Sequence, residues 1–113
     1  MVEVDDVRRL ALSLPRTTEH LIRDRVKFRV KQLVYVAFSR DETLMGFGFP
    51  NEQRAALVES EPDKFQLPSV GDMRYHWVVA RLAALDEQEM TELVTDAWRM
   101  VVPKSVAREH LGS

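Results

Sequence analysis

Residues 23–49 read RDRVKFRVKQLVYVAFSRDETLMGFGF, and the periodicity of this segment predicts three consecutive β-strands. In its first third, basic residues occupy every second position, and Val26, Phe28 and Val30 fill positions between them. Because successive side chains of a strand point to opposite faces of a sheet, this pattern predicts one apolar face and one cationic face. The cationic positions are Arg23, Arg25, Lys27, Arg29 and Lys31.

The second strand is predicted at residues 33–38, and it is apolar at every position. Such a pattern is expected where both faces of a strand are largely covered. Regular alternation divides its side chains between the two faces as Leu33, Tyr35 and Ala37 on one, and Val34, Val36 and Phe38 on the other.

A third strand is predicted at residues 43–49, after a turn at residues 39–42, and Pro50 ends it. Gly46 and Gly48 within it indicate a bulge or a close backbone approach, because no Gly-Lys-Ser/Thr sequence follows that would form a phosphate loop. The connection between the first two strands is Lys31-Gln32, which lacks the Gly or Asn that two-residue turns favour. Both a tight turn and a longer or bulged connection stay open there.

The segments on either side of these strands carry helical periodicity. Pro15, Pro62 and Pro103 follow three of the apolar-periodic segments and end them. Residues 16–20 read as a loop. The helices are expected at residues 5–14, 51–60, 86–102 and 104–111, with a short strand near 65–67 and a last strand at 75–82.

The last strand divides into a set typical of a core lining and a set that would face outward. The outward set would lie on the same face of the sheet as the basic residues. For Trp77 the sequence does not decide between that face and the core. The core set is His76, Val78, Ala80 and Leu82, and the outward set is Tyr75, Trp77, Val79 and Arg81. The whole order predicts an α+β two-layer sandwich, with an antiparallel sheet and the helices on one face.

Composition predicts one soluble domain over residues 1–113, since 45% of residues are apolar and 30% are charged. The chain has no Cys, which excludes disulfides, thiolate metal sites and Cys nucleophiles, and suits a cytoplasmic location. The first nine residues are acidic and carry no apolar run, so we expect no signal peptide. No apolar run reaches the about 18 residues that a membrane span needs, so we expect no membrane association.

The charges are unevenly distributed along the chain, although the net charge is only −2. The basic strand contrasts with an acidic helix, so one side of a two-layer molecule would be positive and the other negative. Such a protein can attract a polyanion while remaining acidic overall. The acidic residues are Asp86, Glu87, Glu89, Glu92 and Asp96.

Several short motifs together resemble the MmcQ/YjbR family of small bacterial proteins. They are LSLP at residues 12–15, TTE at 17–19, VKFRV at 26–30, PDKF at 62–65, WV at 77–78, AWR at 97–99 and VPK at 102–104. The resemblance implies an α-β-β-β-α-β-β-α fold of the secretion-chaperone-like kind, related in shape to frataxin-like sheets, and DNA binding through a "double wing". The chain departs from the family where Gly is frequent, at Arg16 and at the Lys31-Gln32 turn.

The first functional hypothesis is a DNA-binding protein. Cations neutralise phosphates and aromatic rings stack on unpaired bases. The competing interpretation is a solubilising sheet face, because long basic side chains cover apolar surface and deter edge pairing. The residues predicted to bind DNA are Arg23, Arg25, Lys27, Arg29, Lys31, Trp77 and Arg81, with Arg74 and Tyr75 as further neighbours.

The second hypothesis is a protein-interaction or chaperone-like domain that uses the open sheet face or an edge, and that forms a homodimer. An enzyme is disfavoured, because His20, His76 and His110 are scattered and form no metal-ligand pair. The frataxin likeness raises iron binding by the acidic helix, but a solvated helix face explains those carboxylates without metal. We therefore expect no catalytic residue, no cofactor, no metal and no small-molecule ligand.

Overall fold

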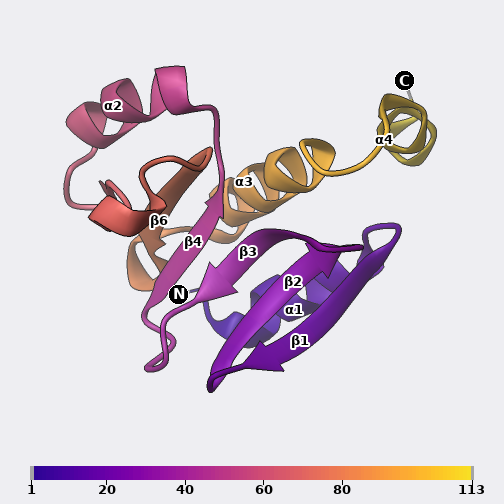
Figure 1. Ribbon diagram of the computed structural model, residues 1–113, viewed down its shortest axis with the longest axis horizontal. Helices are drawn as coiled ribbons and strands as arrows, with labels where there is room; N and C mark the ends of the chain where they lie inside the picture. Colours follow the sequence, from indigo (N-terminus) through magenta and orange to yellow (C-terminus); the bar gives the residue numbers. More distant parts are fainter. Residues whose placement is uncertain (1, 113) are drawn as a thin grey trace.

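The computed structural model describes residues 2–112, which form one six-stranded antiparallel sheet packed with helices (Figure 1). The strand order is β1-β2-β3-β4-β6-β5. This architecture confirms the α+β class. The elements are α1 (Val4–Ser13), β1 (Thr17–Ile22), β2 (Arg25–Val30), β3 (Leu33–Phe38), β4 (Leu44–Gly48), α2 (Asn51–Ser60), β5 (Phe65–Gln66), η1 (Val70–Asp72), β6 (Trp77–Arg81), η2 (Leu82–Ala84), α3 (Glu87–Arg99) and α4 (Lys104–Leu111).

The sheet has one strand more than the sequence predicted before α2. Residues 16–20 were expected as a loop, but Thr17–Ile22 forms β1 and pairs with β2 along its whole length. β1 is an edge strand, so it bonds on one side only, and its Thr-Thr-Glu-His sequence stays largely at the surface. Its backbone hydrogen bonds to β2 hold this strand in the sheet. It therefore does not need the alternating apolar side chains that mark a half-buried strand in a sequence.

Two tight turns flank β2 and take two of the predicted cations out of the strand. Arg23 and Asp24 form the β1–β2 turn with φ of 53° and 64°, and Lys31 opens the β2–β3 turn with φ of 55°. The prediction that Arg23 and Lys31 continue the strand is thus wrong. The two-residue alternative for Lys31-Gln32 is confirmed, since Val30 pairs directly with Leu33. Arg16 and Lys31, at positions where Gly was expected, are both left-handed, with φ of 66° at Arg16.

A β-bulge in the β2–β3 ladder changes which side chains of β3 face the core. Phe28 pairs with Val36 and Arg29 with Val34, so Tyr35 has no partner across the ladder. Tyr35 and Val36 are consecutive and both fully buried, contrary to the regular alternation predicted for this strand. The extra residue allows both to enter the core. The Tyr35 hydroxyl lies 2.8 Å from Thr17 Oγ1 in β1.

Helices α1 and α3 cover the same face of the sheet. Figure 1 shows both behind the strands, and α3 contacts α1, β3 and β4. Asp86 caps α3 by accepting from the Glu89 backbone N–H at 2.7 Å. The fully buried Trp98 of α3 donates from Nε1 to the carbonyl of Pro15 at 2.9 Å, which ties this helix to the start of β1. The opposite face, which we call the open face, is left for the basic residues.

Candidate nucleic-acid interface

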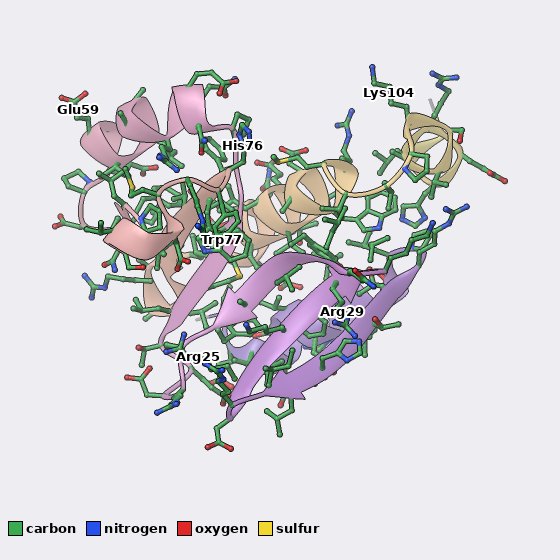
Figure 2. All side chains as sticks on the ribbon, viewed as in Figure 1. Arg25, Arg29, Glu59, His76, Trp77 and Lys104 are labelled. Atoms are coloured by element: carbon green, nitrogen blue, oxygen red, sulfur yellow. The ribbon has the colours of Figure 1, made fainter. Side chains whose placement is uncertain are left out.

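Three of the predicted cations project from β2 onto the open face. Arg25, Lys27 and Arg29 alternate with the buried Val26, Phe28 and Val30, as the periodicity predicted. Figure 2 shows Arg25 and Arg29 along β2, with α1 behind the sheet. The cations of the strand therefore share one side of the molecule.

Directly paired residues extend this face across the sheet. Lys27 pairs with Ala37, Ala37 with Gly46, and Gly46 with Val79. Opposed residues in an antiparallel ladder point to the same face, so this row is continuous. A Cβ atom on Gly46 would lie only 2.5 Å from Trp77 Nε1, which puts the indole ring on this face. Trp77 is half-buried there, and of the two positions left open by the sequence the open face is the correct one.

Arg81 lies on the same face but apart from the cations of β2. It ends β6, pairs with Leu44, and donates from Nη1 to the carbonyl of Asp63 at 3.1 Å. Three strand spacings, about 14 Å, separate β6 from β2. Arg74 and Tyr75 precede β6 and stack on each other, with the guanidinium carbon 4.9 Å from the ring centroid.

The cations around β2 have no carboxylate partner within residues 2–112. The ion pairs of this part of the chain lie elsewhere and involve Arg8, Arg9, Lys64 and Arg99. Hydrogen bonds to Glu89 and Glu61, for example, raise the pKa of Lys64. Its charge is therefore neutralised by one carboxylate from α3 and one that follows α2. The charges of Arg25, Lys27 and Arg29 are by contrast uncompensated. Arg29 Nε is buried and finds no acceptor among the described residues.

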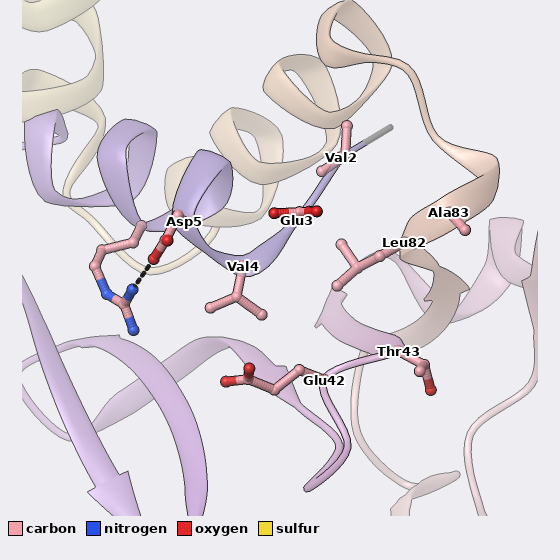
Figure 3. Close-up of a pocket in the computed structure, with 9 residues that line it drawn as sticks. Val2, Glu3, Val4, Asp5, Glu42, Thr43, Leu82 and Ala83 are labelled. Atoms are coloured by element: carbon pink, nitrogen blue, oxygen red, sulfur yellow. Dashed lines mark hydrogen bonds and ion pairs between the residues drawn. The ribbon is translucent and has the colours of Figure 1, made fainter.

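Two hollows of the described surface differ in character. The larger, about 420 Å³, lies between the N-terminal segment, the β3–β4 turn and η2 (Figure 3). Glu3, Asp5 and Glu42 line it, and its one cation, Arg8, is already bound to Asp5 and Glu19. The hydrogen bond to Glu19 raises the pKa of Arg8, so this guanidinium stays charged in its acidic surroundings. That hollow repels anions.

The smaller hollow, about 360 Å³, is lined by Ile22, Arg23, Arg25, Lys27 and Arg40, and we call it the hairpin hollow. Sequence reasoning missed Arg40, which comes from the β3–β4 turn and stands outside the basic period of β2. In the sequence, Arg40 lies in a turn of charged residues. Nothing in that turn indicates that it packs against the β1–β2 turn.

Comparison with known proteins places this fold in a family. The YjbR family model matches residues 12–100. The chain belongs to the YjbR family. No curated protein matches this YjbR chain at a significant level. The crystal structure of Deinococcus radiodurans protein DR2400, with a domain described as DUF419, is similar at a TM-score of 0.77, with 20% identity over 99% of this chain and 89% of that one. At this identity the likeness concerns the fold.

The three histidines of this YjbR protein lie in unrelated places. His20 Nε2 is 3.0 Å from Thr18 Oγ1 on β1, and His76 Nδ1 accepts from the Asn51 backbone N–H at 3.0 Å. The His110 ring packs edge-on against Trp98. Within residues 2–112 no three metal-binding side chains come together. None of the helices in that range is both long and apolar enough to span a bilayer.

Proposed function

We propose that this YjbR protein is a non-enzymatic DNA-binding protein that contacts phosphates through its open face. One observation carries the proposal: Arg25, Lys27 and Arg29 project together from β2, and none is neutralised by a carboxylate of residues 2–112. Like charges held on one strand repel one another, and a row of phosphates relieves that repulsion while releasing counterions. The absence of Cys supports a cytoplasmic location for this activity.

The distribution of charge supports a polyanion despite the net charge of −2. The exposed Glu87, Glu92 and Asp96 belong to α3, which covers the other face of the sheet. The acidic residues are therefore separated from the cations by the thickness of the sheet. A molecule with this polarity orients its positive side toward DNA during encounter.

Trp77 adds an aromatic surface to the same face. Its ring covers Gly46 and remains partly accessible, so an unpaired base can stack on its outer part. Phosphate contacts and stacking on base faces carry little sequence information. We therefore propose binding with little sequence preference.

Reversing two cations of β2 tests the proposal. Arg25→Glu/Lys27→Glu removes two positive charges that make no hydrogen bond in the structure, so folding should be retained. We expect duplex affinity to fall at least tenfold. The slope of log K against log salt should change from about −4, the value for about four phosphate contacts, to about −2. Fluorescence anisotropy on one labelled duplex at several salt concentrations measures both.

The matched control is Lys104→Glu/Arg108→Glu on α4, which lowers the net charge by the same amount. Lys104 is remote from Arg25 and Arg29 (Figure 2). This variant should lose less than about threefold in affinity, because only the long-range field changes. Equal losses in the two variants, or affinity that does not respond to salt, would remove the basis of the proposal.

A second candidate is a protein-interaction domain, favoured by the edge strand β1. Leu21 of this strand is 71% exposed, and its outer backbone edge has no partner strand in the sheet. An extended peptide or a second copy could pair there. A two-fold dimer through the open face is disfavoured, because it would oppose the same cations of both copies. Sedimentation at rising protein concentration, repeated with Leu21→Lys, separates edge dimerisation from a monomer.

A further inference from the structure

The hairpin hollow lies where two turns of the sheet meet. The β1–β2 turn and the β3–β4 turn lie side by side at one end of the strands (Figure 1), and Arg40 Nε donates to the Arg23 carbonyl at 3.4 Å. Arg23 and Arg40 thus belong to the turns, whereas Arg25 and Lys27 come from the first half of β2. Four cations from three segments surround one hollow, with Ile22 as its apolar wall.

The carboxylates near this hollow are engaged elsewhere or make no ion pair. Asp41 accepts from Ser39 Oγ at 2.7 Å, from Thr43 Oγ1 at 2.8 Å and from the Thr43 backbone N–H at 3.1 Å. These hydrogen bonds lower the pKa of Asp41 and fix the β3–β4 turn that carries Arg40. Glu42 lines the other hollow. Asp24 is exposed in the β1–β2 turn and forms no ion pair with a described residue.

A convergent set of cations suits a different anion from a linear one. Each phosphodiester of a DNA strand carries one negative charge, and these charges are spread along the backbone. A phosphate monoester carries about −1.5 to −2 charges at neutral pH on three terminal oxygens, gathered at one point. Guanidinium groups bind such oxygens in pairs, so several arginines around one hollow match a monoester better than a diester.

We propose that the hairpin hollow binds a phosphate monoester, the dianionic group at a phosphorylated end of a DNA strand or on a free mononucleotide. The strand-end form of this inference rests on the proposed DNA-binding function, whereas the mononucleotide form does not. A strand whose end sits in the hairpin hollow continues along β2 past Lys27 and Arg29. The open face would then hold the diesters and the hollow the terminal group.

Matched single-stranded oligonucleotides test the proposal directly. One sequence is prepared with a 5′-phosphate, with a 3′-phosphate and with hydroxyl groups at both ends, and anisotropy competition measures each affinity. We expect one phosphorylated form to bind on the order of tenfold more tightly than the unphosphorylated form, because hydrogen bonds to charged groups contribute on that scale. Inorganic phosphate and a nucleoside monophosphate are tested separately by thermal shift at constant ionic strength.

Two variants localise the effect. Arg40→Gln should abolish the preference for a phosphorylated end and reduce binding of the unphosphorylated form by less than about twofold, because Arg40 lies outside the row on β2. Arg81→Gln, on the far side of the open face, should retain the preference. Arg40→Lys keeps the charge without the guanidinium fork and should restore only part of it. Urea unfolding of each variant shows whether the fold is intact.

The outcomes separate this inference from the proposed function. Equal affinity for all three oligonucleotides, with no thermal shift from inorganic phosphate or the mononucleotide, overturns the inference and leaves DNA binding by the open face standing. A thermal shift with phosphate or the mononucleotide that Arg40→Gln removes, without binding of any oligonucleotide or of the duplex, supports the hollow and overturns the DNA proposal. No binding of any of these probes, and none of the duplex, overturns both.

Discussion

The indole ring of Trp77 lies against Gly46, so closely that a Cβ atom on Gly46 would come within 2.8 Å of three ring atoms. The two residues belong to neighbouring strands, and Gly46 pairs with Val79 rather than with Trp77 itself. The ring therefore lies diagonally across the ladder, in the space that a side chain at position 46 would fill. Trp77 keeps its place on the open face because its neighbour has no side chain.

Gly46→Ala should destabilise the protein by about 1–3 kcal/mol, because the new methyl group forces the indole out of its position. Urea unfolding measures the loss, and a red shift of tryptophan fluorescence reports the displaced ring. Gly48→Ala is the control, since its Cβ would meet Met100 Sδ at 3.5 Å and Ala97 at 3.6 Å, which are ordinary contacts. Similar losses for both variants would contradict the steric explanation, as would failure of Trp77→Leu to rescue Gly46→Ala.

Asp24→Gly should stabilise the protein by about 0.5–1 kcal/mol, because Asp24 holds a φ of 64° that glycine adopts without steric cost. The substitution also removes a negative charge from the turn beside Arg23, so DNA affinity should rise. Asp24→Asn removes the same charge and keeps a side chain. It should tighten DNA binding as much as Asp24→Gly does and stabilise the fold less; the reverse order in stability would show that the turn is not strained.

Arg54 is a buried charge whose loss should cost about 2–3 kcal/mol. Its guanidinium donates to Asn51 Oδ1 at 2.8 Å and to the carbonyls of Tyr75 and Met73 at 2.9 and 2.7 Å, joining α2 to the segment before β6. Arg54→Lys should be nearly as damaging as Arg54→Met, since an ammonium cannot reproduce the fork. Chemical unfolding compares them with Gln53→Ala, an exposed neighbour on α2 that should change stability by less than about 0.5 kcal/mol.

Tyr35 should make the fold sensitive to alkali. Burial raises the pKa of its hydroxyl to about 12, and the hydrogen bond with Thr17 lowers it in part. The unfolded chain releases this proton near pH 10, so stability is fully present below about pH 10 and declines by about 2–3 kcal/mol as the pH rises through 12. Urea unfolding at a series of pH values tests this. Tyr35→Phe should show a weaker decline; an unchanged decline would assign it to other groups.

Where buried residues alternate with cations along a strand, the sequence predicted correctly which cations share a face of the sheet. Val26, Phe28 and Val30 fix the direction of the strand, and the cations of β2 follow from them. Arg23 and Lys31 are also basic and continue the two-residue spacing of the cations, but they lie in turns. The turns contain no glycine, so composition gave no sign that the strand had ended.

Two other features depend on neighbours that no local pattern encodes. Glu19 of β1 is bound by Arg8 of α1, which satisfies a polar residue in an edge strand that reads as a loop. Arg40 joins the hairpin hollow because two turns distant in sequence lie together. Periodicity describes single elements, whereas both of these arrangements arise when elements pack.

The hydrogen bond from Trp98 to the Pro15 carbonyl joins α3, which is made late in synthesis, to the start of β1, which is made early. This order affects how the chain folds during synthesis. The strands from β1 to β4 pair in sequential order and can form as soon as they leave the ribosome, whereas α3 is made later, after α2, β5 and β6. At ordinary rates of translation, on the order of several seconds pass between completion of β4 and of α3. During that interval Phe38 of β3 and Phe47 of β4 lack the cover that α3 gives them in the folded protein, so the nascent chain depends on other contacts, or on a chaperone, to avoid aggregation.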